Sequence, residues 1–179
     1  ALQRCNDLNK SGLAMKNLEK SNTVAVVGGG SWGTALGALL AGKGYAVQIL
    51  LRDAEVAKAI NARHENSRYL PGFALPPNLK ASCEADKVLP QANLIVWAVP
   101  CQASRKALRE LKAFLPPRPL LVSATKGIEA ERLQTVEAIV FEEIAALEPR
   151  YAVLSGPSFA EEVLKNMPTA VVLSCRDED

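Results

Sequence analysis

The stretch Thr-Val-Ala-Val-Val-Gly-Gly-Gly-Ser-Trp-Gly-Thr-Ala-Leu-Gly, residues 23–37, decides the fold of this chain. Its β-prone run, its spaced glycines and its later alanine and leucine predict a buried strand, a tight turn and a helix that begins near Ser31. Gly28, Gly30 and Gly33 follow the strand–turn–helix order of the dinucleotide-binding fingerprint Gly-x-Gly-x-x-Gly. Gly28 allows the turn, Gly30 lets a pyrophosphate approach the backbone, and Gly33 lets the helix lie close to the strand. The alternative interpretation is a glycine-rich turn that only packs closely.

Predicted strands and helices alternate along the rest of the chain. Further strands are expected at residues 46–51, 79–82, 93–100, 120–124, 151–154 and 169–173. Helices are expected at residues 31–43, 54–63, 84–89, 102–114 and 132–147, with a short one before Pro168. We therefore predict an α/β fold with one NAD(P)-binding domain over residues 23–179. Its architecture is a Rossmann-like, doubly wound, mainly parallel sheet with helices on both faces.

Composition and charge exclude several classes of function. The 179 residues carry a formal net charge of +2, which is too small to argue for binding to nucleic acid or an anionic membrane. No apolar run approaches the ~20 residues that a transmembrane helix needs. The cysteines lack Cys-x-x-Cys spacing, and the only histidine, His64, lies between charged residues as at a solvated helix end, so no metal site is expected. Reduced thiols of this kind indicate an intracellular, cytoplasmic protein.

Residues 1–22 are predicted to form a polar leader or extension that is peripheral to function. Its loosely spaced leucines are compatible with a helix, whereas the apolar core of a secretory signal is missing. A short leading helix, the remains of an organelle transit peptide and residues of artificial origin all stay open as interpretations. A transit peptide would indicate a plastid protein in place of a cytoplasmic one.

Arg52 and Asp53 stand side by side after the second predicted strand. An acidic residue at this position usually binds the ribose hydroxyls of NAD, whereas an arginine accommodates the additional phosphate of NADP. Because Asp53 is also a good cap for the helix that follows, the sequence favours Arg52 as the cofactor residue and NADP over NAD. The alternative for Arg52 is a solvated charge at the end of a strand.

Residues with unusual chemistry follow the carboxyl ends of the predicted strands. Four such segments should meet in one crevice, namely residues 28–33, 98–101, 125–127 and 155–160. Lys126 is placed there to hold a phosphate or polarise a carbonyl, unless it is a solvated lysine. Ser158 is expected to cap the helix that it begins, with or without a bond to substrate. Tyr69, in a long Pro- and Asn-rich loop, either reaches over the cofactor or only packs.

Five sequence motifs follow one another in a recognisable order. They are Val-Gly-Gly-Gly-Ser-Trp-Gly-Thr-Ala (27–35), Asn-Ser-Arg-Tyr-Leu-Pro-Gly (66–72), Trp-Ala-Val-Pro (97–100), Thr-Lys-Gly-Ile-Glu (125–129), and Leu-Ser-Gly-Pro-Ser-Phe-Ala-Glu-Glu-Val (154–163) followed by Pro-Thr-Ala (168–170). In this order the chain resembles the amino-terminal domain of NAD(P)-dependent glycerol-3-phosphate dehydrogenases of the bacterial and plastid type. The resemblance covers residues 23–174.

The resemblance implies reduction of dihydroxyacetone phosphate to sn-glycerol 3-phosphate, by hydride transfer from NADPH or NADH. It places cofactor contacts at the glycine turn and at Ser31, Trp32, Arg52, Tyr69, Lys126 and Ala160. It places substrate contacts at Lys126, Gly156 and Ser158.

The family also has a second, helical domain, which supplies the catalytic lysine that exchanges the proton at the carbonyl oxygen. The sequence stops before that domain, so no catalytic residue is expected within it. The chain is then a fragment, or a partner supplies the rest, or it is not an enzyme by itself. A non-catalytic dinucleotide-binding module and a related dehydrogenase for another small substrate stay as alternatives, although Lys126 and Ser158 disfavour the first. We expect the full-length protein to be a homodimer.

Overall fold

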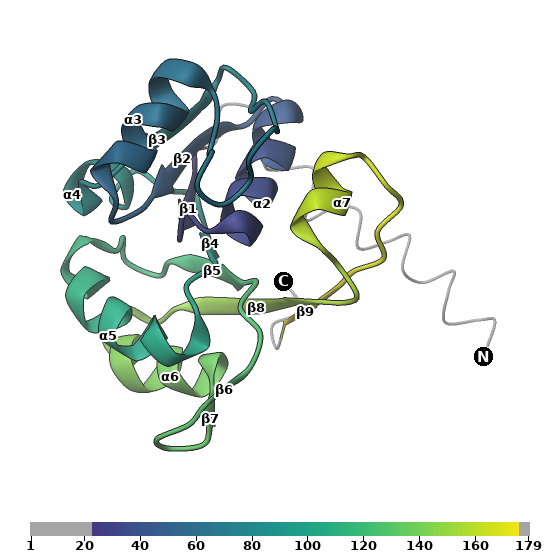
Figure 1. Ribbon diagram of the computed structural model, residues 1–179. Helices are drawn as coiled ribbons and strands as arrows, with labels where there is room; N and C mark the ends of the chain where they lie inside the picture. Colours follow the sequence, from purple (N-terminus) through teal and green to yellow (C-terminus); the bar gives the residue numbers. More distant parts are fainter. Residues whose placement is uncertain (1–22, 176–179) are drawn as a thin grey trace.

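The computed structural model describes residues 23–175 (Figure 1). The leader predicted for residues 1–22 and the polar tail at residues 176–179 lie outside the described residues. The described part contains a seven-stranded sheet with helices on both faces, which confirms the predicted doubly wound architecture. Within residues 23–175, no helix combines the length and apolar character that a segment spanning a bilayer needs.

The main sheet has the strand order β3-β2-β1-β4-β5-β8-β9. The strands are β1 (Thr23–Val27), β2 (Ala46–Leu50), β3 (Leu79–Ser82), β4 (Leu94–Trp97), β5 (Leu120–Ser123), β8 (Arg150–Ser155) and β9 (Val172–Cys175). All neighbours pair in parallel except β8 and β9, which are antiparallel. The chain changes direction across the sheet between β1 and β4, and doubly wound sheets bind their ligands at this switch point.

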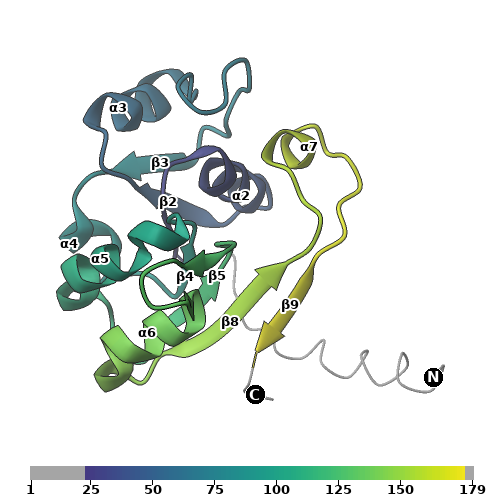
Figure 2. The same ribbon diagram turned by 60° about the horizontal axis from the view of Figure 1, so that its bottom comes forward.

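Helices cover both faces of the sheet, as Figure 2 shows from a second direction. One face carries α2 (Ser31–Gly42), α3 (Ala54–Arg63) and α7 (Ala160–Leu164). The other carries α4 (Ala85–Val88), α5 (Cys101–Leu111) and α6 (Val136–Ile144), with 3₁₀ turns η2 (Lys112–Phe114) and η3 (Ala145–Leu147) after the last two.

Strand β1 explains why the predicted strands are apolar almost throughout. Val24 and Val26 point into the core below α2 and α3, whereas Ala25 and Val27 point into the core on the α5 side. None of these four side chains is more than 3% exposed. Since successive side chains of a strand alternate between faces, a strand covered on both sides needs an apolar residue at every position.

The predicted helix 132–147 is wrong over its first turn. Residues 128–135 instead form a small antiparallel hairpin, β6 (Ile128–Glu129) with β7 (Gln134–Thr135), and α6 begins after it. The Thr135 hydroxyl caps α6 by accepting from the Ala138 N–H at 3.3 Å. Leu133 matched the helical spacing but is 80% exposed, with a left-handed φ of 54° in the hairpin loop.

The last strand lies later in the chain than predicted. Residues 169–171, expected to begin it, lie in the loop between α7 and β9, and β9 pairs from Val172 to Cys175 with β8. Its side chains are exposed, so no buried alternation marked its register in the sequence.

Candidate functional site

The glycine turn between β1 and α2 is shaped by contacts that only glycine tolerates. Gly28 has φ +116°, and a Cβ on it would lie 2.6 Å from the Ala98 carbonyl oxygen. A Cβ on Gly33 would lie 2.0 Å from the Gly28 carbonyl oxygen. At Gly30, by contrast, a Cβ would meet no atom within 4 Å. Gly28 and Gly33 are therefore required by the protein's own packing, whereas Gly30 borders open space into which a ligand can come close.

The start of α2 offers unpaired donors to that open space. Gly30 is the N-cap, and its carbonyl accepts the first intrahelical bond, from the Thr34 N–H at 2.9 Å. The N–H groups of Ser31, Trp32 and Gly33 precede that bond, so they have no partner within the helix. The first turn contains no acidic residue, so the positive end of the helix dipole is not neutralised locally. These features suit a phosphate or pyrophosphate.

A buried asparagine that the sequence did not single out braces this turn. Asn66 is fully buried, and its Nδ2 donates to the Gly29 carbonyl oxygen at 3.0 Å and lies 2.8 Å from the Thr34 Oγ1. Its own carbonyl accepts from the Leu70 N–H at 2.8 Å, which fixes the loop that carries Tyr69. In the sequence, Asn66 stood only as the first residue of a long loop and of the motif at residues 66–72, and its partners lie more than thirty residues away.

The structure confirms the helix cap expected of Asp53, and it leaves Arg52 outside that cap. Asp53 caps α3, since its Oδ1 accepts from the Glu55 and Val56 N–H groups at 3.0 and 3.3 Å. Its Oδ2 pairs with Arg68. The bond from the Val56 N–H is the largest cause that lowers the pKa of Asp53, so this carboxylate stays charged. Arg52 is exposed beside it, at the same sheet edge as the glycine turn, and its cofactor role stays a prediction.

Trp32 and Tyr69 lie around the turn in different ways. The Trp32 indole N–H donates to the Ala124 carbonyl oxygen at 3.1 Å, so the ring links α2 to the end of β5. The indole N–H is thus engaged by the protein, which leaves the backbone N–H and the ring of Trp32 for a cofactor. Tyr69 is 44% exposed, and the Arg68 guanidinium lies 5.4 Å from its ring centroid. The stack leaves Tyr69 outside the core, which argues against the packing-only interpretation.

The ends of β4 and β5 are tied together beside the glycine turn. The Thr125 hydroxyl lies 2.8 Å from the Val99 carbonyl oxygen and 3.2 Å from that of Trp97. Gly127, at φ +111°, passes Cys101 closely enough that a Cβ would lie 3.6 Å from the Cys101 Cβ. Burial raises the pKa of the Cys101 thiol, which keeps it neutral.

Three predicted substrate residues meet at a single carbonyl oxygen. Lys126 Nζ donates to the Gly156 oxygen at 3.0 Å, and Ser158 Oγ donates to the same oxygen at 3.3 Å. Gly156 has φ +139°, and a Cβ there would lie 2.6 Å from the Ala170 oxygen. The four segments predicted to converge are thus linked by contacts from one to the next, from Gly28 through Ala98–Cys101 and Thr125–Gly127 to Gly156.

The capping role expected of Ser158 is wrong. The N-cap of α7 is Phe159, and no side chain caps this helix. Ala160 is the first helical residue and is half-buried. The Ser158 hydroxyl donates to the Gly156 carbonyl oxygen and makes no bond to the start of α7. It therefore shares its acceptor with Lys126.

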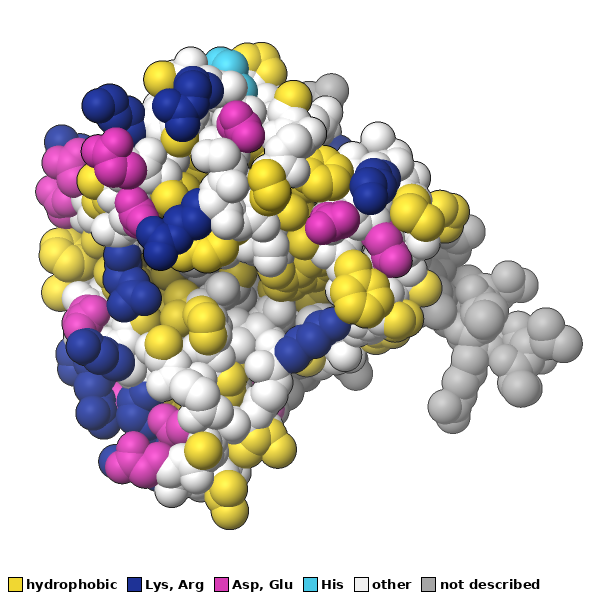
Figure 3. Space-filling model, viewed as in Figure 1, with side chains coloured by type: hydrophobic (Ala, Val, Ile, Leu, Met, Phe, Trp, Pro, Cys, Tyr) yellow, Lys and Arg dark blue, Asp and Glu magenta, His cyan; other side chains and the backbone are white. Residues whose placement is uncertain are grey.

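The surface above these segments is hollowed. Figure 3 shows a recess across the middle of this face, between the part built from α2 and α3 and the part built from α5 and α6. In the described part of the chain, no group of three or more His, Cys, Asp or Glu side chains is placed to hold a metal ion. The site therefore offers backbone N–H groups, one ammonium and one hydroxyl, which are groups that hold phosphates and carbonyl oxygens.

Comparison with known proteins bears on this arrangement. A family model described as NAD-dependent glycerol-3-phosphate dehydrogenase N-terminus matches residues 23–179. A glycerol-3-phosphate dehydrogenase (NAD(P)+) of Nitratidesulfovibrio vulgaris is 53% identical over 156 residues, which are 87% of this chain and 47% of that protein. One from Lawsonia intracellularis is 46% identical over 169 residues, covering 90% of this chain and 48% of the relative.

Solved structures agree with the sequence relatives. The crystal structure of a glycerol-3-phosphate dehydrogenase from Coxiella burnetii superposes with a TM-score of 0.82 at 32% identity, covering 89% of this chain and 48% of that one. A yeast glycerol-3-phosphate dehydrogenase gives a TM-score of 0.77 at 28% identity, with 87% and 47% covered. The chain spans about half the length of the curated relatives it matches. Because the family model matches all of the described residues, the chain belongs to the NAD-dependent glycerol-3-phosphate dehydrogenase family and corresponds to its N-terminal domain.

Proposed function

We propose that this chain supplies the cofactor site and part of the substrate site of a glycerol-3-phosphate dehydrogenase. The reaction is the reduction of dihydroxyacetone phosphate to sn-glycerol 3-phosphate with NADPH or NADH. The observation that carries the proposal is the meeting of Lys126, Gly156 and Ser158 next to the glycine turn. A module that only binds a dinucleotide has no use for a second cluster of phosphate-holding groups at the later strand ends.

The glycine turn fits a dinucleotide on its own geometry. The open space at Gly30 admits a pyrophosphate to the backbone, where the first N–H groups of α2 would hold it. When bound, the nicotinamide supplies the hydride. The ring of Trp32 and the Tyr69 loop would border the cofactor, with Asn66 holding both the loop and the turn in place.

Lys126 is proposed to act on the reacting end of the substrate. Its ammonium is exposed, and it already donates to a carbonyl oxygen. A substrate phosphate or carbonyl oxygen would take the place of that acceptor, or share the ammonium's three donors with it. Ser158 would add a hydroxyl to the same ligand oxygen. Neither group replaces the proton-transferring lysine, which we propose lies in a second, helical domain of the full-length protein.

We propose NADP as the preferred cofactor. Both oxygens of Asp53 are engaged, one by the start of α3 and one by Arg68, whereas the Arg52 guanidinium is exposed beside them. An exposed arginine next to a carboxylate whose two oxygens are engaged favours a 2′-phosphate over a ribose hydroxyl. The full-length protein is further proposed to be cytoplasmic and to form a homodimer. Light scattering of the purified protein tests the homodimer through its molar mass.

Substrate binding can be tested on the chain itself. Energy transfer from Trp32 to the nicotinamide ring should report NADPH binding, and dihydroxyacetone phosphate should then shift the apparent NADPH dissociation constant. A shift that disappears in Lys126→Met supports the dehydrogenase. NADPH binding with no response to dihydroxyacetone phosphate would favour a non-catalytic dinucleotide-binding module, and a response only to other small carbonyl compounds would favour a different dehydrogenase.

A further inference from the structure

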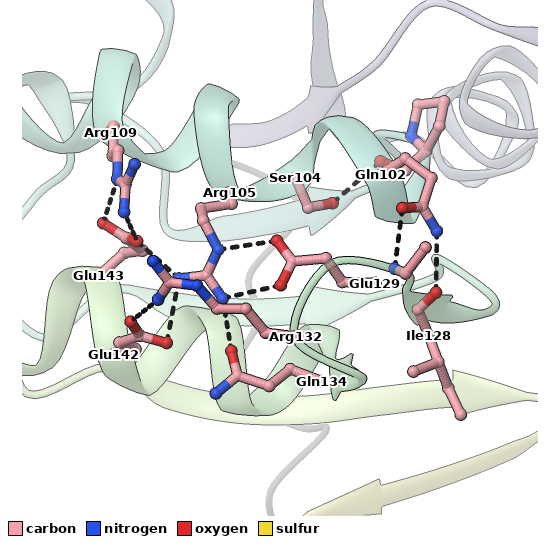
Figure 4. A network of polar contacts seen from close by, with 12 residues as sticks. Gln102, Ser104, Arg105, Arg109, Ile128, Glu129, Arg132, Gln134, Glu142 and Glu143 are labelled. Atoms are coloured by element: carbon pink, nitrogen blue, oxygen red, sulfur yellow. Dashed lines mark hydrogen bonds and ion pairs between the residues drawn. The ribbon is translucent and has the colours of Figure 1, made fainter.

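Side chains of α5 reach across to the segment that follows Lys126. Gln102 Nε2 donates to the Ile128 carbonyl oxygen at 2.8 Å, and the Ala130 N–H donates to Gln102 Oε1 at 3.0 Å (Figure 4). One side-chain amide therefore pairs with two backbone groups on either side of Glu129, one in β6 and one in the residue that follows it. This is how a neighbouring strand would pair with them.

One turn further along α5, Arg105 holds the same hairpin from inside. Its side chain is 8% exposed, and its guanidinium makes a bidentate pair with Glu129, with Nε to Oε1 at 2.7 Å and Nη2 to Oε2 at 3.0 Å. It also donates to Gln134 on β7 and to Glu143 on α6, the latter at 2.8 Å. The bonds from Arg105 are the largest cause that lowers the pKa of Glu129, so this buried pair stays ionised.

The charges of this cluster balance among themselves. Arg109 pairs with Glu143 at 2.8 Å, and Arg132 pairs with Glu142 at 2.5 Å, so three arginines face three glutamates (Figure 4). A cluster that binds an anion would carry an excess of positive charge. The three arginines here are matched by three glutamates, so the cluster is suited to anchoring the hairpin and not to binding an anion.

The anchored hairpin begins two residues after Lys126 in the chain. On one side of Lys126, the Thr125 hydroxyl is tied to the end of β4; on the other, Gly127 turns at φ +111° into the clamped β6. Lys126 is thus an exposed residue between two fixed points. α5 itself begins at Cys101, shortly after Ala98 and Val99, which pack against Gly28, so the helix that holds the hairpin continues from the segment beside the glycine turn.

We propose that Gln102 and Arg105 are positioning residues, which hold the Lys126 ammonium at the distance from Gly156 and from the glycine turn that the site uses. The anchoring rests on the contacts above. Its consequence for substrate rests on the proposed function of Lys126.

Anchoring can be measured by trypsin digestion of the chain, because trypsin cuts after lysine. The Lys126–Gly127 bond is the anchored one, and the Lys43–Gly44 bond at the end of α2 is an internal reference. In Gln102→Ala, two hydrogen bonds to the hairpin segment are lost, so the rate of cutting at Lys126 relative to Lys43 should rise by about tenfold or more through the local opening equilibrium. Arg105→Lys, which keeps the charge but not the fork, should raise the same ratio.

The control is Glu110→Ala, which removes an exposed side chain from the same helix and should leave the ratio unchanged. The anchoring is overturned if the ratio of cutting at Lys126 to cutting at Lys43 is the same in Gln102→Ala as in the wild type. This includes the case in which both peptide bonds are cut faster by the same factor.

A second readout separates positioning from general folding. With NADPH bound, Gln102→Ala should weaken dihydroxyacetone phosphate about tenfold and leave NADPH affinity unchanged, because the side-chain hydrogen bonds of Gln102 within residues 23–175 go to residues 128 and 130 and not to the glycine turn. If Gln102→Ala raises the cutting ratio but leaves the affinity for dihydroxyacetone phosphate unchanged, Gln102 anchors the hairpin but has no positioning role. Failure of the wild type to bind dihydroxyacetone phosphate would count against the proposed function and leave the digestion result untouched.

Discussion

The Lys126 ammonium donates to the Gly156 carbonyl oxygen at 3.0 Å, although the two residues are thirty positions apart in the chain. The contact joins the end of β5 to the end of β8 on the side where the glycine turn opens. Ser158 donates to the same oxygen, so a charged and a neutral donor meet at one point. An oxygen of a bound ligand at this point would find both donors already aligned.

Replacing Lys126 by methionine tests the charge at that point. In the full-length protein, we expect Lys126→Met to lower kcat/KM for dihydroxyacetone phosphate by roughly 10²-fold or more, an electrostatic loss of about 3 kcal/mol. Stability should hold, because the side chain is exposed. Lys43→Met, which removes an exposed lysine at the far end of α2, is the matched control for net charge. Equal kinetics in the two variants would leave Lys126 as a solvated loop residue.

Replacing Arg52 tests the cofactor preference. Arg52→Ala should weaken NADPH about ten- to a hundredfold, because a charge-assisted hydrogen bond to the 2′-phosphate is worth roughly 1.5–3 kcal/mol, and should barely affect NADH. Dissociation constants for both cofactors are the measurement, with Arg63→Ala at the other end of α3 as the control. An equal loss of affinity for NADPH and NADH would mean that Arg52 acts through a general electrostatic effect and not through a bond to the 2′-phosphate.

Asn66 should matter to the cofactor as well as to stability. Asn66→Ala leaves the Gly29 carbonyl oxygen and the Thr34 hydroxyl without this partner, so we expect a loss of about 1–3 kcal/mol of unfolding free energy and several-fold weaker NADPH binding. Asn61→Ala is the matched control. It removes a similar pair of bonds between α3 and Ala81, at 2.8 and 2.9 Å. If both variants weaken NADPH equally, Asn66 has no specific part in shaping the turn.

The arginine–glutamate cluster predicts sensitivity to acid. Hydrogen bonds from Arg105 hold the pKa of Glu129 and of Glu142 below the usual 4.5, and those from Arg109 do the same for Glu143. The folded pKa is lower than the unfolded one, so their stabilisation is complete above about pH 4.5 and is lost as the pH falls through the folded values.

Urea unfolding between pH 6 and pH 3 measures this effect. In Glu129→Gln, the free energy of unfolding should be lower by about 1–3 kcal/mol at pH 6, and its decline toward pH 3 should be shallower, since one depressed carboxyl is gone. An identical decline in wild type and variant would show that Glu129 does not titrate as the buried pair requires.

The local chemistry of the glycine turn and the strands could be read from the sequence, and the long-range partners could not. Gly28 and Gly33 obey steric rules that act within a few residues and on the adjoining strand, and the Asp53 cap is likewise local. The hairpin was missed because Leu133 fitted a helical period. What fixes the hairpin is Arg105, which lies 24 residues before its partner Glu129, and such a pairing leaves no periodic trace.

Gly30 separates ligand binding from folding better than any other residue of the turn. A Cβ at Gly30 meets no protein atom within 4 Å and its φ of −71° suits any residue, so Gly30→Ala should change stability by no more than about 1 kcal/mol. The methyl group would nevertheless occupy the space that a pyrophosphate needs. Gly42→Ala, at the other end of the same helix and equally open, is the matched control.

The decisive measurement is therefore the NADPH dissociation constant of these two variants beside the wild type. We expect Gly30→Ala to bind NADPH at least about tenfold more weakly, a loss of about 1.4 kcal/mol or more, and Gly42→Ala to bind it as the wild type does. Equal affinity in all three proteins would mean that the cofactor does not approach the backbone at Gly30, and that the glycine turn is only a packing device.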